Sequence, residues 1–151
     1  MKLTLTGIEN SVPWRAAEIQ MPTYDVPAAQ KKAVEAPKWV HFGIGNIFRV
    51  FIGGIADGLL EQGLLDRGIT CVETFDYDVV DKIYRPYDNL GLQVILNPDG
   101  TRDVRVLGAF AEAVKAQCTD AAQWARLKEI FRAPSLQLVS FTITEKGYAL
   151  K

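Results

Sequence analysis

The sequence has few cysteines, a single histidine and almost no net charge. Its two cysteines, Cys71 and Cys118, are too few for a disulfide framework or a four-ligand zinc site. We therefore expect no metal site and a reducing, cytoplasmic environment. The 17 basic and 18 acidic residues give a formal net charge of −1. This balance excludes the basic surface that would bind a nucleic acid or an anionic membrane.

Long apolar runs are also missing, and we expect no secretory leader. The richest apolar stretch, residues 39–60, is interrupted by Arg49 and Asp57, so it does not predict a membrane span. The first 15 residues lack a continuous apolar core followed by a small-residue cleavage site. What is present is a chain of 151 residues, 48% of them hydrophobic, which is the size and composition of one globular domain.

Prolines punctuate the first quarter of the chain, at positions 13, 22, 27 and 37. Because proline fixes φ and lacks an N–H group, this spacing favours an extended lead-in over residues 1–37 that packs on the domain. We expect the domain itself to span residues 38–151. Its last four residues follow a strand-like run without a polar tail, so we expect the fold to be truncated before its last strands.

The domain opens with a pattern typical of a βαβ unit. Residues 39–42 are β-prone and run into Gly43-Ile44-Gly45. Apolar residues then recur every four positions from Ile47, which predicts an amphipathic helix that ends near Gly63. A second β-prone run covers residues 69–74. The unit predicts two parallel strands joined by a right-handed crossover.

The rest of the chain predicts further strands and helices around this unit. We expect an irregular piece at 78–87, a hairpin of 92–96 with 104–107 around a turn at 97–100, helices at 110–117 and 120–131, and a strand at 136–144. The resulting fold class is α/β: a Rossmann-like, doubly wound and mostly parallel sheet with an inserted β-hairpin.

The glycine turn between the first strand and the helix is the motif that indicates chemistry. In a dinucleotide-binding turn the first glycine permits the tight bend, and the second lets the backbone approach a pyrophosphate at the helix N-terminus. Phe48 stands where a third glycine is usual, so a purely structural turn remains the alternative. Arg49 could meet phosphate oxygens or be only a solvent-exposed arginine. The candidate cofactor-binding residues here are Gly43, Ile44, Gly45, Asn46, Ile47, Phe48 and Arg49.

Acids after the second predicted strand are candidates for the ribose hydroxyls of a dinucleotide. We favour Asp76 and Asp78 over Glu73, because they lie beyond the strand, toward its carboxyl end. An acid here would repel a 2′-phosphate, so NAD is expected rather than NADP. The alternative is that this cluster is only a solvated loop.

Other residues have simpler interpretations. Thr144 and Glu145 end the last predicted strand and could border the nicotinamide, or they could form a helix cap or turn. His41 is expected to be a hydrogen-bonded core histidine, and Cys71 an inert core thiol. Three glycines inside the predicted helix are expected to allow close helix–sheet packing: Gly53, Gly54 and Gly58.

Two segments of the sequence resemble the mannitol dehydrogenase family of polyol-specific long-chain dehydrogenases and hexuronate reductases. Residues 40–49, VHFGIGNIFR, are similar to the family's His-x-Gly-x-Gly-x-x-x-Arg pattern. Residues 140–148, SFTITEKGY, resemble its Ser-Leu-Thr-Ile-Thr-Glu-Gly-Gly-Tyr motif, with Lys146 in place of a glycine. The resemblance extends from about Pro22 onward. Phe48 and residues 50–52 differ from the residues that are frequent in the family, which leaves the substrate branch open.

The resemblance implies a zinc-independent enzyme that transfers hydride between NAD and a sugar alcohol or sugar acid. In this family a lysine acts as general acid/base, helped by asparagine and histidine, in a mostly helical C-terminal domain. Those residues would lie beyond Lys151, so no catalytic residue is assigned, and this chain alone is expected to be inactive.

Two other functions compete with this interpretation. A dinucleotide-binding domain without chemistry would carry the same glycine turn. A methyltransferase that uses S-adenosylmethionine also has a glycine-rich loop after its first strand. That class usually has an acid just before the glycines and a denser G-x-G-x-G pattern, and residues 39–45 have neither.

Overall fold

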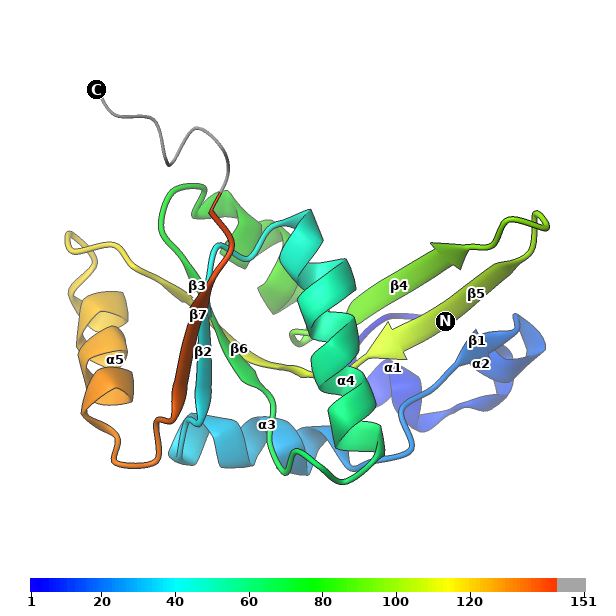
Figure 1. Ribbon diagram of the computed structural model, residues 1–151, viewed down its shortest axis with the longest axis horizontal. Coiled ribbons are helices and arrows are strands. Elements are labelled where there is room, and N and C mark those ends of the chain that lie inside the picture. Colours follow the sequence, from blue (N-terminus) through cyan, green and yellow to red (C-terminus); the bar gives the residue numbers. More distant parts are fainter. Residues whose placement is uncertain (144–151) are drawn as a thin grey trace.

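The computed structural model describes residues 1–143 (Figure 1). It has an α/β fold, in which a four-stranded parallel sheet lies beside a smaller, mixed three-stranded sheet. The parallel sheet has the order β6-β3-β2-β7. Its fourth strand along the chain, β7, pairs with the free edge of the first strand, β2, which is the strand order 3-2-1-4 of a Rossmann sheet. Its strands are β2 (Trp39–Phe42), β3 (Ile69–Glu73), β6 (Phe110–Lys115) and β7 (Leu138–Phe141). The predicted fold class is therefore confirmed.

The βαβ unit is present as the sequence predicts. β2 and β3 pair in parallel, with Val40 opposite Thr70. Between them, a π-helical turn η1 (Phe48–Ile52) continues into α4 (Gly53–Glu61), and Gly63 follows with a φ of +68°. Phe48, Ala56 and Leu60 of this segment are buried in the core. The apolar stripe that starts at Ile47 lies largely outside the core, since Ile47, Phe51 and Ile55 are exposed.

The predicted hairpin joins a second sheet. β4 (Gly91–Leu96) and β5 (Arg102–Leu107) are antiparallel, and the turn between them contains Gly100 with a φ of +85°. A two-residue strand, β1 (Ile19–Gln20), pairs with the outer side of β5 in parallel. The irregular piece before the hairpin consists of a π-helical turn η2 (Val80–Tyr84) and a 3-10 turn η3 (Arg85–Tyr87).

The prediction of a helix over residues 110–117 is wrong, because this segment forms β6. Five residues of β3 pair with it in parallel, from Ile69 to Glu73. Its alanines and glutamate favour a helix locally, and its buried positions fall in pairs, a pattern that a helix would also give. Tertiary pairing with β3 overrides this local preference.

The extended lead-in predicted over residues 1–37 is also wrong in its local structure. The segment contains α1 (Leu5–Glu9), α2 (Val12–Ala16) and α3 (Val26–Glu35). Pro13 and Pro27 lie in the first turns of α2 and α3, where a missing N–H group costs nothing. Figure 1 shows α3 crossing beneath the parallel sheet, and its Ala29 and Ala33 are buried.

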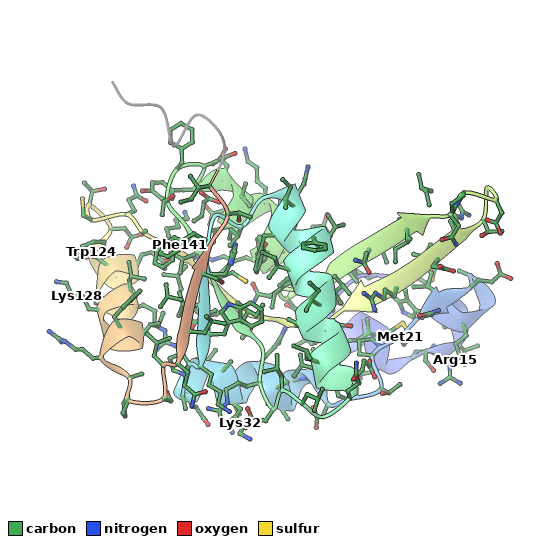
Figure 2. All side chains as sticks on the ribbon, viewed as in Figure 1. Arg15, Met21, Lys32, Trp124, Lys128 and Phe141 are labelled. Carbon is green, nitrogen blue, oxygen red and sulfur yellow. The ribbon has the colours of Figure 1, made fainter. Side chains whose placement is uncertain are left out.

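Helices cover both faces of the parallel sheet. α5 (Ala121–Arg132), the helix predicted at 120–131, is capped by the Asp120 carboxylate and buries Leu127 and Ile130 against one face. On the same side Phe141, labelled in Figure 2, stacks on Phe42 with ring centroids 5.1 Å apart. η1 and α4 cover the opposite face with the larger core cluster. Within residues 1–143, no helix is long and apolar enough to cross a membrane.

The three helical glycines differ in what surrounds them. A side chain at Gly53 would overlap the ring of Phe110, and one at Gly54 would contact the side chains of Gln93 and Arg105. Nothing lies within 4 Å of the position that a Cβ would take at Gly58. Close packing therefore explains Gly53 and Gly54, and the prediction is wrong for Gly58.

We predict that Gly53→Ala destabilises the protein by about 1–3 kcal/mol, because the buried Phe110 ring is packed against Phe48 and Tyr84 and has no room to move. Gly58→Ala is the matched control and should be neutral or stabilising by up to about 1 kcal/mol. Denaturant unfolding of both variants measures the difference. Equal stabilities would show that α4 does not press on Phe110.

Candidate functional site

A cleft of about 650 Å³ lies at the carboxyl ends of β2, β3 and β7. The chain leaves β2 toward β3 and later returns to β2's other side as β7, so this is the topological switch point of the sheet. Open α/β sheets bind their ligands at such a point. Three segments line the cleft: the glycine turn and helix start, the residues just after β3, and Thr142 with Ile143 after β7.

The two glycines of the turn have different physical requirements. Gly43 has a φ of +87°, and a Cβ there would lie 2.5 Å from the carbonyl oxygen of Thr142. Gly45 has no positive φ, and nothing lies within 4 Å of the position its Cβ would take. Folding therefore demands a glycine at position 43 and not at 45. The open space over Gly45 belongs to the cleft.

Hydrogen bonds fix the backbone of the turn. The Gly43 N–H donates to the Val72 carbonyl at 3.0 Å, and the Ile44 N–H donates to the Glu73 carboxylate at 3.3 Å. The Ile44 carbonyl accepts from the Tyr84 hydroxyl at 2.9 Å. Among residues 1–143, no hydrogen bond uses the amide N–H groups of Gly45, Asn46 or Ile47. These groups begin the helix and are free to bind an anion.

The only histidine of the chain lies beneath the turn. His41 is fully buried in β2, and its Nδ1 and Nε2 lie 2.8 Å from the hydroxyl oxygens of Ser140 and Thr142. Its ring stacks on Phe48, with the centroids 4.2 Å apart. Burial lowers the pKa of His41 from 6.5 to about 4, so the ring is neutral at physiological pH. The expectation of a hydrogen-bonded core histidine is confirmed.

The three candidate acids occupy different environments. Glu73 is buried, and its carboxylate accepts the backbone N–H groups of Ile44, Thr74 and Phe75. Asp76 is exposed and lines the cleft. Asp78 lines a neighbouring groove and forms an ion pair with Lys82 at 2.6 Å. Of the three, Asp76 is the carboxylate available to a ligand in the cleft.

The remaining candidates are only partly brought together. Gly43, Gly45, Asn46, Ile47 and Phe48 line the cleft. The side chain of Ile44 is buried in the core, and both its backbone groups are already bonded.

Arg49 lies in the neighbouring groove. Its guanidinium donates to the Ile44 carbonyl at 3.2 Å and to the Asn46 side chain, so it braces the turn from outside the cleft. Thr144 and Glu145 lie outside the described residues.

Four cleft residues were not predicted: Thr74, Phe75, Thr142 and Ile143. Thr142 and Ile143 line it because β7 ends at Phe141, earlier than the strand expected to reach residue 144. Phe75 lines it with 91% of its side chain exposed. Its position two residues after a buried strand is the signal that could have marked it.

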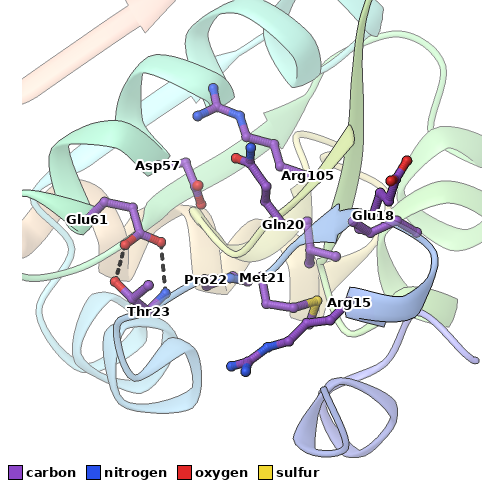
Figure 3. A pocket seen from close by; sticks show the side chains of 11 residues that line it. Arg15, Glu18, Gln20, Met21, Pro22, Thr23, Asp57, Glu61 and Arg105 are labelled. Carbon is purple, nitrogen blue, oxygen red and sulfur yellow. Dashed lines mark hydrogen bonds between the residues drawn. The ribbon is translucent and has the colours of Figure 1, made fainter. Parts of the chain in front are cut away.

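A second, larger cavity of about 860 Å³ lies between β1, β5 and α4 (Figure 3). Its two carboxylates on α4 already have hydrogen-bond partners. The buried Asp57 carboxylate accepts from the Tyr24 hydroxyl at 2.6 Å and from the Gly108 N–H at 2.9 Å. Glu61 accepts from the backbone N–H of Thr23 at 2.9 Å. The cleft at the glycine turn, with its free N–H groups, is therefore the better candidate site.

Comparisons with known proteins agree with this geometry. No family model matches the chain. It is 46% identical, over its full length, to a D-mannonate oxidoreductase of Thermotoga maritima, of which it covers 28%. It is 29% identical over 136 residues to a polyol:NADP oxidoreductase of Gluconobacter oxydans, which covers 87% of this chain and 26% of that protein.

A solved structure is also similar. The ternary complex of Pseudomonas fluorescens mannitol 2-dehydrogenase with NAD and D-mannitol matches 98% of this chain and 28% of that chain, with a TM-score of 0.77 and 27% identity. The fold and the cleft thus define an α/β domain of the Rossmann type.

The comparisons confirm the resemblance to the mannitol dehydrogenase family, because this chain is similar to polyol and sugar-acid oxidoreductases. It spans about a quarter of the length of the curated relatives it matches.

We predict that the folded protein loses stability through His41 as the pH falls from about 6.5 to about 4. In this window the unfolded chain binds a proton that the buried ring does not, so unfolding becomes more favourable. The loss should approach about 3 kcal/mol at the low end. Denaturant unfolding of the parent and of His41→Gln, across this pH range, isolates the contribution. Parallel pH profiles for the two proteins would contradict it.

Proposed function

We propose that this chain is the NAD-binding part of a longer oxidoreductase, which transfers hydride between NAD(H) and a sugar alcohol or sugar acid. The observation that carries the proposal is Gly45, a glycine that the fold does not require. It keeps space open above three N–H groups at the helix start that have no hydrogen-bond partner within residues 1–143. The resemblance to D-mannonate oxidoreductase and mannitol 2-dehydrogenase supports the substrate class.

The residues of the cleft fit a dinucleotide. The N–H groups of Gly45, Asn46 and Ile47 would hold the pyrophosphate, and the helix dipole would favour its negative charge. Asp76 would accept hydrogen bonds from the ribose hydroxyls next to the adenine. Thr142 and Ile143 would border the other half of the cofactor, together with Thr144 and Glu145. When bound, NAD supplies a hydride acceptor and NADH a hydride donor.

The proposed chemistry needs groups that this chain does not supply. The family resemblance implies a lysine general acid/base, with asparagine and histidine, in a C-terminal domain beyond Lys151. We therefore propose that residues 38–151 bind and orient the cofactor, while the remaining part of the protein binds the substrate. Two free cysteines, one buried and one exposed, support a cytoplasmic location.

We predict that Gly45→Val abolishes NADH binding without unfolding the full-length protein. Among residues 1–143, nothing lies within 4 Å of the position that the new Cβ would take, and the valine methyl groups would fill the space that the pyrophosphate needs. NADH fluorescence titration measures the affinity, and circular dichroism checks the fold. Gly58→Ala, at another glycine with open space around it, is the control and should bind like the parent. If Gly45→Val binds NADH as the parent does, the turn is only structural.

We also predict that NADH binds more tightly than NADPH, because the exposed Asp76 carboxylate would repel a 2′-phosphate. Asp76→Ala should lower the ratio of the NADPH Kd to the NADH Kd about tenfold, which is the change expected from the loss of one charged hydrogen bond. Asp78→Ala should change it less, since that carboxylate is paired with Lys82. Asp99→Ala, an exposed acid at the hairpin turn, is the control. A parent protein that prefers NADPH would refute the role given to Asp76.

A further inference from the structure

A chain of partly buried hydrogen bonds links β2 to β7 and ends on the glycine turn. The Trp39 indole Nε1 donates to the Ser140 hydroxyl at 2.7 Å. The Ser140 hydroxyl lies 2.8 Å from Nδ1 of His41, and Nε2 of the same ring lies 2.8 Å from the Thr142 hydroxyl. The Thr142 hydroxyl in turn bonds the carbonyl oxygen of Gly43. The parallel register places Trp39, His41 and their partners alternately along the two strands.

The two ends of this chain determine the direction of every hydrogen bond in it. An indole N–H can only donate, and a carbonyl oxygen can only accept. The Thr142 hydroxyl donates its only proton to the Gly43 carbonyl, so the hydroxyl oxygen must accept from His41 Nε2–H. Nδ1 of the neutral ring then carries no proton and accepts from the Ser140 hydroxyl, whose oxygen accepts from Trp39. A neutral histidine with its proton on Nε2 satisfies all the groups.

This chain of hydrogen bonds ends where the glycine turn contacts the end of β7. Gly43 leaves no room for a side chain against Thr142, and the Thr142 N–H donates to the Phe42 carbonyl at 2.9 Å. The same Thr142 lines the cleft. His41 also stacks on Phe48, the first residue of η1. One buried ring therefore supports both the carbonyl side of the turn and the start of the helix.

We propose that His41 and Thr142 are positioning residues for the dinucleotide, which hold the Gly43 turn against β7 so that the N–H groups of Gly45, Asn46 and Ile47 face the cleft. This inference rests on the proposed function. It goes beyond that function by assigning the geometry of the phosphate-binding turn to a directional hydrogen-bond chain that starts at Trp39. Neither side chain touches the reacting atoms.

The test separates the hydroxyl of Thr142 from its bulk. Thr142→Val keeps the shape and removes the hydroxyl, so the Gly43 carbonyl loses its partner. It should weaken NADH binding by the full-length protein about tenfold or more, which is the change in Kd expected from the loss of one partly buried hydrogen bond. Thr142→Ser restores the hydroxyl and should bind within about threefold of the parent.

The matched control is Ser135→Ala. This serine hydroxyl donates to the Pro37 carbonyl at 2.8 Å, near the opposite ends of β2 and β7. Loss of the Ser135 hydroxyl should lower the free energy of unfolding about as much as loss of the Thr142 hydroxyl does. It should leave the NADH affinity unchanged. If Thr142→Val binds NADH as tightly as Ser135→Ala does, the positioning role is refuted.

Nitrogen NMR of the imidazole in the unsubstituted protein gives a second measurement, which does not depend on any variant folding. It should show a neutral His41 with the proton on Nε2 at pH 7. A proton on Nδ1 would break the chain, because the single proton of Thr142 cannot bond both Nε2 and the Gly43 carbonyl, and it would overturn the inference. These outcomes differ from failure of the proposed function, in which the parent itself does not bind NADH.

Discussion

The close approach of the glycine turn to the end of β7 is the constraint on which the candidate site depends. Gly43 meets the backbone of Thr142 with no room for a Cβ, and the left-handed φ at this position directs the chain into the helix. The neighbouring backbone groups are bonded to Val72, Glu73 and Tyr84. With the backbone groups of Gly43 and Ile44 bonded in this way, the N–H groups that follow them, of residues 45–47, lie at the cleft.

The surrounding fold serves this arrangement. The parallel order of β3, β2 and β7 brings three strand ends to one edge, and helices on both faces supply the burial that holds the strands in register. The mixed sheet packs against η1 and α4 through Gln93, Arg105 and the close contact at Gly54. The helix start is therefore fixed from the core side, while the side toward Asp76 remains open.

Much of this could be predicted from local sequence patterns, because β2, α4, β3, the hairpin and α5 each follow their own periodicity and turn chemistry. Residues 110–115 could not, since their helix-like composition yields to pairing with β3, which is distant in sequence. In the site, the glycine spacing identified the turn. The bonding of Glu73 to the turn and the contact of Thr142 with Gly43 depend on strand order, which no local pattern shows.

The central claim is that the free N–H groups at the helix start bind the phosphates of a dinucleotide. The most direct measurement is the change in backbone amide chemical shifts of the ¹⁵N-labelled protein when NADH is added. We expect the largest changes at Gly45, Asn46 and Ile47. The absence of changes there, or changes concentrated around Arg15 and Arg105 in the second cavity, would contradict it.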